Sequence, residues 1–415
     1  MAFIGTGIFY ILAFVSVYVQ MFFLITFLEN RKKISNRKGK IELKEYKGVT
    51  IIVPCWNEES TVESTVNSIL NLNYPKDKLK LIIVDDGSTD NTWSVIKKFE
   101  NIEGIKILHK ENGGKHTALN LALEHVDTEY LGCLDADSSA DPESLIRMMS
   151  YFENDPKIMA VAPSIIVHNS NNFIQHAQQA EYNMAVYIKK MLGFLGAIHV
   201  TPGPLTIFKK KVFDDLGPYR KAHNTEDMEI AYRMQKHLYK IEQCNDAYVY
   251  TNTPETIVKL YKQRLRWIYG FINNTIDYRN LIFKKKYGNF SIFTVPMGVF
   301  SLVASTYLFG KLVYSAVVFL FQKLSEFQAL GFHMNFQKPN LDPFFINTEA
   351  FVFISIIIYF FVLLSIFIGN KMVKGKGEIF SMNIIYFFSV FSIIGPFWLI
   401  KAVYNTLISH KPSWR

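Results

Sequence analysis

Four long apolar runs constrain the fold of this 415-residue chain more than any other feature. One lies near the N-terminus and three follow the polar middle of the chain: Ile8–Leu28, Ser291–Phe321, Ala350–Gly369 and Ile379–Ile400. Each has roughly 20 residues or more, the length that an α-helix needs to cross a hydrocarbon core of ~30 Å. The runs therefore predict a multi-pass membrane protein rather than buried helices of a soluble core.

Basic residues beside the runs predict which side of the membrane the polar middle occupies. Lys and Arg are dense between positions 31 and 40, and further lysines lie between positions 371 and 376. The positive-inside rule places both segments, and the polar middle with them, on the cytoplasmic side of the plasma membrane. One crossing by each late run would then leave the basic C-terminal end outside. Either the last run is re-entrant or the second run does not cross once, and both alternatives stay open.

Charge and cysteine content argue against several other classes. The formal net charge is +9, and most basic clusters lie beside the runs, as expected for a face against anionic lipid. The sequence has no nucleic-acid recognition motif, so no nucleic-acid partner is expected. Cys55, Cys133 and Cys244 have no paired spacing, which favours a reducing compartment, and the histidines show no zinc-ligand spacing.

The polar middle, from about Glu42 to Tyr287, alternates short apolar strands with helical patterns. This alternation predicts an α/β fold with a mostly parallel sheet and flanking helices, because parallel strands need crossover connections. The expected strands are Val49–Cys55, Leu79–Val84, Ile105–Leu108, Tyr130–Leu134 and Met159–Ala162. A helix is expected to start at Ser60, which has the capping-box spacing to Glu63, and another at Asp141-Pro142.

Polar signatures follow the first four strands. They are Asn57-Glu58, Asp85-Asp86, Asn112–Lys115, and Asp135 with Asp137. In open α/β sheets, ligands bind at the carboxyl ends of the strands. We therefore expect these groups to gather along one edge of the sheet.

Asp135 and Asp137 are two residues apart, so an extended backbone points both carboxylates the same way. Two carboxylates can hold Mg²⁺ or Mn²⁺ incompletely and leave coordination sites for phosphate oxygens. The alternative is a surface loop with helix-capping aspartates. The position at a strand end favours the metal site.

The loops after the second and third strands have structural and binding interpretations. Asp85–Asp90 suits a turn with an N-cap, and one of its aspartates can also contact the uracil or ribose of a nucleotide. Asn112–Lys115 lacks the Walker A spacing, which disfavours ATP hydrolysis. Its glycines and Lys115 still offer N–H groups and charge to an anion, although a plain strand-to-helix turn explains the glycines equally well.

Two later signatures complete the set. Thr225-Glu226-Asp227 opens a helical pattern, where acidic residues suit the helix dipole and Asp227 is a candidate general base. Sugar transfer from a nucleoside diphosphate needs such a base, and a cation to stabilise the leaving diphosphate. Gln263–Trp267 lies on an expected helix, Thr256–Asn273, that suits a membrane interface. The same signature can place Arg266 on a diphosphate and Trp267 under an acceptor sugar.

In this order the signatures resemble the membrane-integrated family 2 glycosyltransferases, a group that includes poly-N-acetylglucosamine, hyaluronan, chitin and cellulose synthases. The resemblance covers Val49 to about Asn273. It implies a GT-A-like fold and an inverting, metal-dependent transfer from a UDP-sugar, with Mg²⁺ or Mn²⁺ as cofactor.

The resemblance also implies roles for individual residues. Asp227 matches the catalytic base, with Glu226 beside it, and Asp135 and Asp137 match the motif for metal and diphosphate. The remaining matches are donor and acceptor contacts: Pro54, Asn57, Glu58, Asp86, Lys115, Gly203, Pro204, Gln263, Arg266 and Trp267. The segment Thr201–Leu205 falls where members of the family have an acceptor-binding turn. It departs from the cysteine- or serine-containing versions of several members, so the identity of the acceptor stays open.

Four regions are expected. They are a membrane anchor with a basic linker (1–41), a cytoplasmic catalytic domain (42–254), interfacial helices (255–290) and a C-terminal membrane region (291–415). The expected activity is transfer of N-acetylglucosamine or another hexose to a growing β-linked polysaccharide, with export of the polymer. The expected partners are the donor, a polysaccharide or lipid-linked acceptor, and the bilayer; an accessory membrane subunit stays open.

Two other functions remain as alternatives. The first is a lipid glycosyltransferase that resembles ceramide glucosyltransferases and adds a single sugar. The second is a transporter with an inactive nucleotide-binding domain, for which the charge of Lys311 within an apolar run is the main support.

Overall fold

The computed structural model describes residues 2–35, 41–330, 350–374 and 381–412 of the chain. The chain divides into two compact units. The smaller unit contains Met1–Leu24 and Met297–Leu364, and the larger contains Ile25–Pro296 and Ser365–Arg415. Every candidate site residue lies in the larger unit.

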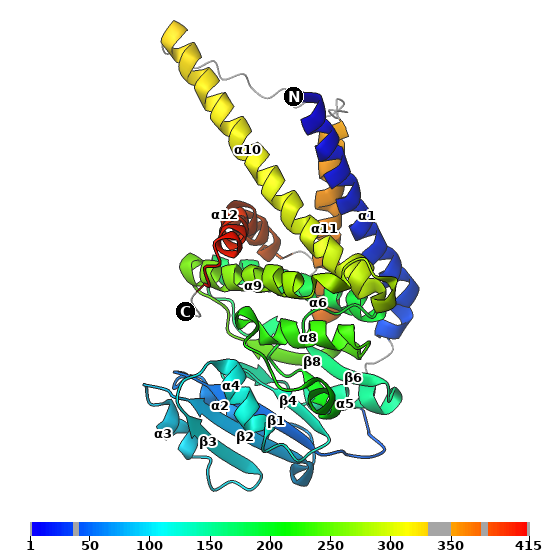
Figure 1. Cartoon of the computed structure of the whole chain (residues 1–415), viewed down its shortest axis with the longest axis vertical. Coiled ribbons are helices and arrows are strands. Elements are labelled where there is room, and N and C mark those ends of the chain that lie inside the picture. Colours follow the sequence, from blue (N-terminus) through cyan, green and yellow to red (C-terminus); the bar gives the residue numbers. More distant parts are fainter. Residues whose placement is uncertain (1, 36–40, 331–349, 375–380, 413–415) are drawn as a thin grey trace. The chain divides into compact units, whose positions relative to one another are not determined.

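An eight-stranded sheet forms the centre of the larger unit, in the order β3-β2-β1-β4-β7-β6-β8-β5 (Figure 1). The strands are β1 (Val49–Cys55), β2 (Leu79–Asp86), β3 (Ile105–Lys110), β4 (Tyr130–Cys133), β5 (Ser138–Ala140), β6 (Ile158–Val167), β7 (Ile207–Lys209) and β8 (Lys240–Thr251). β3, β2, β1 and β4 are parallel, as are β6 and β8. β7 runs antiparallel to both β4 and β6, and β5 runs antiparallel to β8.

The predicted α/β fold with flanking helices is confirmed, and all five expected strands are present. The sheet is more mixed than expected, because β7 and β5 introduce antiparallel pairs. These two strands have three residues each and pair with partners distant in sequence. Neither therefore has a local signal. β8 was also not predicted, although its alternate residues are buried over much of its length.

Helices cover the sheet and complete its core. They are α2 (Val62–Leu70), α3 (Thr92–Lys97), α4 (Lys115–Leu123), α5 (Ser144–Asn154), α6 (Phe173–Phe194), α7 (Lys211–Leu216), α8 (Glu226–Lys236) and α9 (Ile257–Asp277). Val53 and Ile83 of the sheet share one apolar core with Val66 of α2 and Leu145 of α5. Because the central strands are covered, they are mostly apolar, as in other buried parallel sheets.

Two predicted helix starts were wrong. α2 begins at Val62, and the capping box does not form, since Glu63 pairs with Lys98 at 3.1 Å. α5 begins at Ser144 rather than at Pro142. Asp141 instead closes a turn before that helix, where its side chain accepts a hydrogen bond from the Glu143 backbone N–H at 3.0 Å.

Four helices are long and apolar enough to cross a membrane: Gly7–Ile34, Phe290–Glu326, Phe353–Val373 and Asn383–Leu407. They belong to α1 (Ala2–Ser35), α10 (Val295–Leu330) with the π-helical turn before it, α11 (Ala350–Lys374) and α12 (Asn383–Leu407). Each corresponds to one predicted apolar run. The start of the last run, at positions 379–380, lies outside the described residues.

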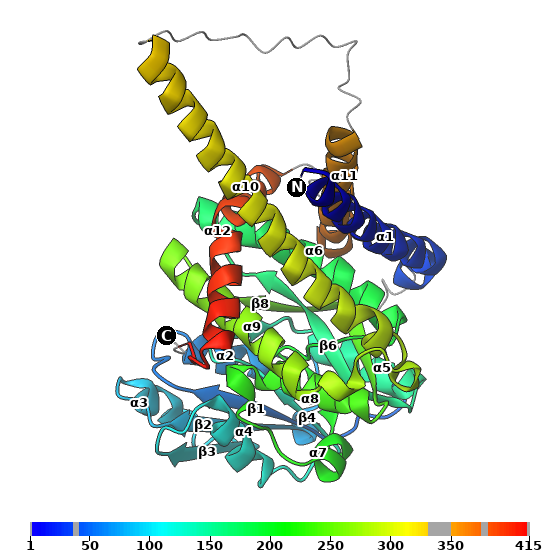
Figure 2. The same ribbon diagram turned by 45° about the horizontal axis from the view of Figure 1, so that its top comes forward.

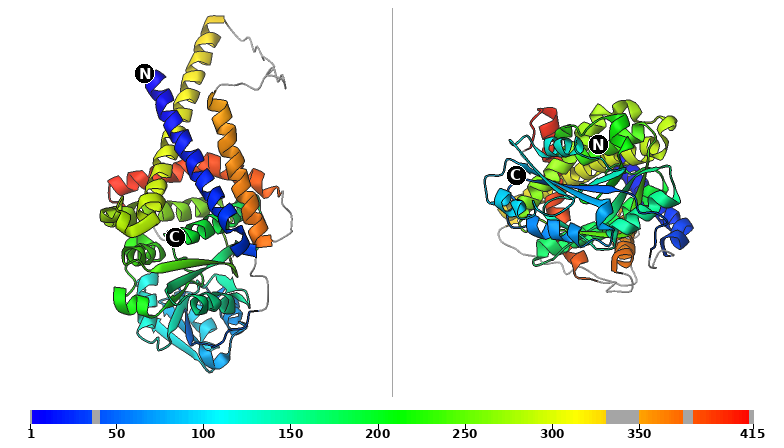
Figure 3. Two further views of the ribbon diagram at one scale, coloured as in Figure 1. Left: turned by 90° about the vertical axis from the view of Figure 1, so that its right-hand side faces the viewer. Right: turned by 90° about the horizontal axis from the view of Figure 1, so that it is seen from below.

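α12 packs against α6 and α9 within the larger unit, and the three helices lie together over β6 and β8 (Figures 2 and 3). Their shared apolar cluster includes Ile174 of α6, Leu265 and Tyr269 of α9, and Val390 and Trp398 of α12. α9 starts where expected, because the Thr256 hydroxyl accepts a hydrogen bond from the Lys259 backbone N–H at 3.3 Å. The last apolar helix thus rests on the helix that carries the Gln263–Trp267 signature.

Candidate active site

A buried lysine brings together residues from three distant elements. Lys115 follows the two glycines at the start of α4, and its Nζ lies 2.6 Å from Asp135 Oδ1 and 3.2 Å from Glu226 Oε1. Asp135 follows β4, and Glu226 is the first residue of α8. The predicted gathering of polar signatures at the sheet edge is confirmed for Lys115 and Asp135, and Glu226 of the later signature joins them.

The charges of this cluster hold one another in place. Burial opposes the Lys115 ammonium, but Asp135 and Glu226 outweigh it and raise the pKa of Lys115 well above its usual value. Burial likewise raises the pKa of Glu226, but the Lys115 charge prevails and the net pKa lies below the ordinary value. Glu226 is therefore an ionised partner of Lys115 and is poorly suited to act as the base.

Asp227 has the opposite character. Burial, with the neighbouring Glu226 charge, raises the pKa of Asp227 to about 6. Its Oδ1 accepts a hydrogen bond from the Met228 backbone N–H at 2.9 Å, and its carbonyl oxygen accepts one from the Thr201 hydroxyl at 2.8 Å. A carboxylate with a pKa near neutrality suits a general base, because it is ionised at working pH yet basic enough to take a proton.

Asp137 lies beside Asp135 and is nearly buried. Burial and the Asp135 charge raise the pKa of Asp137 to about 6, while the Ser138 hydroxyl donates to its Oδ1 at 3.0 Å. Within the described residues, no three His, Cys, Asp or Glu side chains form a metal site. Two mutually repelling carboxylates fit a divalent cation that takes its other ligands from a diphosphate or water.

The segment Pro202–Thr206 closes over the Lys115–Asp135 pair. A Cβ atom at Gly203 would lie 2.5 Å from Lys115 Nζ and 2.9 Å from both Asp135 carboxylate oxygens. The Thr206 hydroxyl donates to the Pro202 carbonyl at 2.6 Å and fixes this turn. Gly203 therefore lines the site, with Pro204 next to it in the turn, and only glycine fits at position 203 without displacing the ion pair.

Hydrogen bonds connect the loops that follow β1, β2 and β3. Asp86 accepts hydrogen bonds from the backbone N–H groups of Gly113 and Gly114, at 3.1 and 2.8 Å, and pairs with Lys110 at 2.7 Å. Asn57 Oδ1 accepts from the Thr89 backbone N–H at 2.8 Å. The side chain of Asp86 thus fixes the glycine turn that presents Lys115.

Glu58 and Pro54 also come from this edge of the sheet. The Glu58 carboxylate accepts a hydrogen bond from the Thr61 hydroxyl at 2.9 Å. Pro54 lies within β1, opposite Val84 of β2. Their expected donor contacts stay a prediction.

Arg266 links α9 to the acidic pair. Its Nη1 donates to the Asn224 carbonyl at 3.2 Å, immediately before Thr225-Glu226-Asp227. Burial is the largest influence on the pKa values of Glu226 and Asp227, and it raises both. The charge of Arg266 lowers both. The contact is close because residue 270 is glycine: a Cβ there would lie 2.3 Å from a Thr225 side-chain carbon.

Arg264 was not predicted, yet it contacts two residues of the same signature. Its Nη1 donates to Gln263 Oε1 at 2.6 Å, and its guanidinium lies 4.2 Å from the Trp267 ring centroid. Its other partner is Glu181 of α6, at 2.5 Å. Basic residues are common on interfacial helices, so the sequence alone did not distinguish Arg264 from an ordinary surface arginine of such a helix.

Two further residues near Asp227 were missed. Lys189 of α6 is partly buried. Loss of water around its ammonium group lowers its pKa to about 8, and the charge of Asp227 opposes this effect. Burial and the Lys189 charge lower the pKa of His199 to about 4. A single lysine in an amphipathic helix has no spacing signal, and its position depends on how α6 packs.

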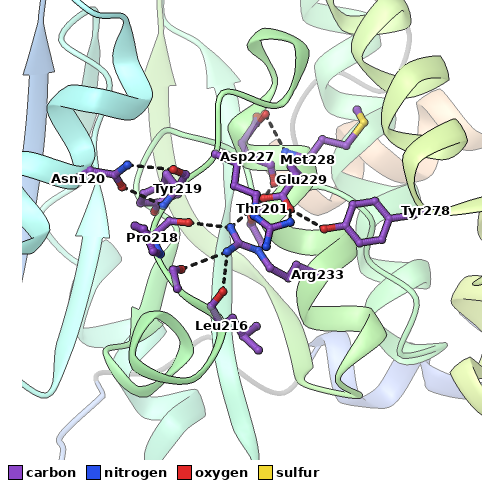
Figure 4. A network of polar contacts seen from close by, with 12 residues as sticks. Asn120, Thr201, Leu216, Pro218, Tyr219, Asp227, Met228, Glu229, Arg233 and Tyr278 are labelled. Atoms are coloured by element: carbon purple, nitrogen blue, oxygen red, sulfur yellow. Dashed lines mark hydrogen bonds and ion pairs between the residues drawn. The ribbon is translucent and has the colours of Figure 1, made fainter.

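A buried arginine in the last turn of α8 anchors that helix (Figure 4). Arg233 donates to the carbonyl oxygens of Leu216, Gly217 and Pro218, at 2.7, 3.2 and 3.0 Å. Its guanidinium also pairs with Glu229 at 2.8 Å, and Glu229 accepts a hydrogen bond from the Tyr278 hydroxyl. This network fixes the helix that begins with Glu226 and Asp227.

Comparison with known proteins agrees with this geometry. Residues 50–217 match the model of glycosyl transferase family 2. The chain is 34% identical over 237 residues to poly-beta-1,6-N-acetyl-D-glucosamine synthase of Staphylococcus aureus, and 34% identical over 233 residues to that of Staphylococcus epidermidis. These alignments cover 57% and 56% of this chain and the same shares of the two relatives, so the chain spans just over half the length of the curated relatives it matches.

A solved structure shares the fold. A mannosyltransferase from Pyrobaculum calidifontis, in complex with GDP-Man and Mn²⁺, superposes with a TM-score of 0.57 at 16% identity, over 89% of this chain and 100% of that one. The family match contains the site residues from Pro54 to Pro204, while Glu226, Asp227 and the Gln263–Trp267 signature follow it. Residues 50–217 therefore resemble glycosyl transferase family 2, and the sheet to which they contribute is a GT-A-like mixed sheet with flanking helices.

Proposed function

We propose that the chain is a membrane-bound inverting glycosyltransferase. It transfers a sugar, with N-acetylglucosamine as the first candidate, from a UDP-sugar to a growing β-linked polysaccharide. The observation that carries this proposal is the placement of Asp227, with a pKa of about 6, beside the Lys115–Asp135 pair. The identity to poly-beta-1,6-N-acetyl-D-glucosamine synthases supports both the donor sugar and the polymeric product.

In this mechanism Asp227 takes the proton of the acceptor hydroxyl as that oxygen forms its bond to the anomeric carbon. The bond between the anomeric carbon and the diphosphate oxygen breaks, and the leaving diphosphate keeps the electron pair. Lys115 and Arg266 contribute positive charge where negative charge develops. Asp135 and Asp137 would hold a divalent cation, Mg²⁺ or Mn²⁺, which supplies Lewis-acid stabilisation of the diphosphate when bound.

The remaining candidate residues take supporting roles in this proposal. Asp86 and Asn57 keep the donor loops in place, with Pro54 and Glu58 at the same edge. Gly203 and Pro204 belong to the turn that the resemblance assigns to the acceptor, and Gly203 lies against the Lys115–Asp135 pair. Gln263 and Trp267 face the acceptor. The domain lies on the cytoplasmic side, where UDP-sugars are made, and the apolar helices carry the product outward.

A product assay tests the proposal. Full-length protein in nanodiscs is incubated with Mn²⁺ and a panel of labelled UDP-sugars, and products are sized. We expect one donor, UDP-N-acetylglucosamine first, to give long chains that Asp227→Asn abolishes. Absence of any long product would overturn the polymerase assignment, and a single-sugar glycolipid would identify a lipid glycosyltransferase instead. Transfer unchanged in Asp227→Asn would overturn the role of the base.

A further inference from the structure

A basic cavity lies beside α8, lined by residues of the turn before α8, of α8 itself and of the end of α9, and by Lys411. Its volume is about 460 Å³, within the range of roughly 300–1,000 Å³ that is common for small-molecule sites. Four cationic side chains line it: Arg220, Lys221, Lys236 and Lys411. We call it the basic cavity. The family match and the proposed reaction give it no role.

The two carboxylates in the basic cavity already have partners. Glu229 is held by Arg233 at 2.8 Å and by the Tyr278 hydroxyl, with Arg220 further away at 3.5 Å. Asp277 pairs with His223 Nε2 at 2.9 Å. In the part of the chain that the structure describes, Lys221, Lys236 and Lys411 form no ion pair. The cavity thus has an excess of positive charge that favours a multiply charged anion.

One wall of the basic cavity is a strained turn. Ala222, His223 and Asn224 have φ angles of 36°, 56° and 62°, and none of them is glycine. Left-handed backbone in such residues costs roughly 1–2 kcal/mol each, so surrounding contacts must hold it. His223 is held by Asp277, and Asn224 by Arg266 at 3.2 Å. An anion that bridges Lys221 and Lys236 would add a further contact to this turn.

The strained turn leads directly into the proposed base. Thr225 follows Asn224, and its hydroxyl accepts a hydrogen bond from Asn274 Nδ2 at 2.9 Å. Glu226 and Asp227 come next, as the first residues of α8. Whatever fixes residues 222–224 therefore also fixes the start of α8.

We propose that the basic cavity binds a phosphate-bearing anion, and that the bound anion stabilises the turn 222–224 ahead of Glu226 and Asp227. This inference goes beyond the proposed function and does not depend on it. Phosphate chemistry fits because its oxygens accept several ammonium donors at once. Lys411 follows the apolar helix α12, so either a lipid headgroup or a soluble phosphate compound has access.

Hydrogen exchange separates the two sources. Full-length protein without divalent metal is placed in phosphatidylcholine nanodiscs, and inorganic phosphate is titrated at constant ionic strength. In the second arm, the nanodiscs contain phosphatidylglycerol and the buffer lacks phosphate. We expect exchange of the backbone amides of residues 222–225 to slow at least fivefold in one arm. Slowing with lipid alone identifies a headgroup, and slowing with phosphate alone identifies a soluble ligand.

The double variant Lys236→Gln/Lys411→Gln tests the site itself. Both side chains are exposed at the cavity, so the fold should persist, and the response should disappear. Lys106→Gln on β3 removes one charge far from the cavity and should leave the response unchanged. Exchange that slows in neither arm would overturn the proposal. A response of equal size in the double variant would overturn it as well.

Discussion

The guanidinium of Arg266 donates a hydrogen bond from Nη1 to the carbonyl oxygen of Asn224, at 3.2 Å. This contact joins the Gln263–Trp267 signature to the segment that holds Glu226 and Asp227. The two contacting residues are about 40 positions apart in the sequence. Through this contact, the helix α9 helps to set the position of the backbone from which α8 starts. The arginine thus has a positioning contact in addition to its charge.

Arg266→Lys keeps the positive charge but removes the planar fork of donors. We expect kcat to fall by about 10²-fold, in the range seen when one transition-state donor is lost. Steady-state rates with the UDP-sugar that is active in the product assay measure this. Arg279→Lys, an exposed position just beyond α9, is the matched control and should keep the original rate. Equal rates in both variants would exclude a special role for Arg266.

Arg264→Gln should loosen the aromatic platform. The change removes the guanidinium that lies 4.2 Å from the Trp267 ring centroid and the ion pair with Glu181. A cation–π contact of about 1–2 kcal/mol corresponds to roughly tenfold weaker acceptor retention. We expect shorter products, with the KM for the donor unchanged. Arg264→Lys should restore part of the product length, and a rise in donor KM instead would contradict a positioning role.

Gly203→Ala should impair catalysis without unfolding the protein. The added Cβ would lie 2.5 Å from Lys115 Nζ, so the ion pair with Asp135 must shift. A displacement of this size costs about 10²-fold in kcat/KM when it misplaces reacting groups. Gly193→Ala is the control, because its Cβ meets neighbours at ordinary contact distances of 3.5–3.6 Å. Similar kinetics for the two variants would show that the pair tolerates movement.

The parallel half of the sheet could be predicted from the sequence because each of its strands has a local apolar run followed by a polar loop. Asp135 and Lys115 were placed at one edge by this rule, and the structure joins them at 2.6 Å. β5 and β7 could not be predicted, since three-residue strands exist only through their distant partners. Lys189 and Arg264 could not be predicted either, because their surroundings also depend on distant partners, through the packing of α6 on α9. The different pKa values of Glu226 and Asp227 depend on Lys115, which the sequence places over 100 positions away.

If Asp227 is the base, as proposed, its pKa should set the pH dependence of the reaction. With a value of about 6, the base is protonated in acid, so kcat/KM should fall below pH 6 and level off above pH 7. The free energy of unfolding should change in the opposite direction to the activity. Because the folded pKa exceeds the unfolded value of about 3.9, the native state binds more protons between pH 4 and 6, and stability decreases as pH rises through this window.

Asp227→Asn should therefore abolish transfer and also raise the melting temperature at pH 7, because the variant has no buried charge to desolvate. Thermal unfolding of both proteins in the same nanodiscs, at pH 5 and pH 7, measures the effect. The difference in melting temperature should be larger at pH 7. A variant that is less stable than the original protein at pH 7 would show that the ionised carboxylate is stabilising.

The packing of α12 predicts the side of the membrane on which the chain ends. α12 rests on α6 and α9, and Lys411 lines the basic cavity together with Arg220. We therefore expect Lys411 to lie on the same side of the membrane as the catalytic domain, which favours a last apolar helix that does not cross once. His410→Cys should react with a membrane-impermeant maleimide only after cells are permeabilised, and Cys55, Cys133 and Cys244 are buried and give little background. Labelling in intact cells would place the end outside and require α12 to leave α9 when it enters the bilayer.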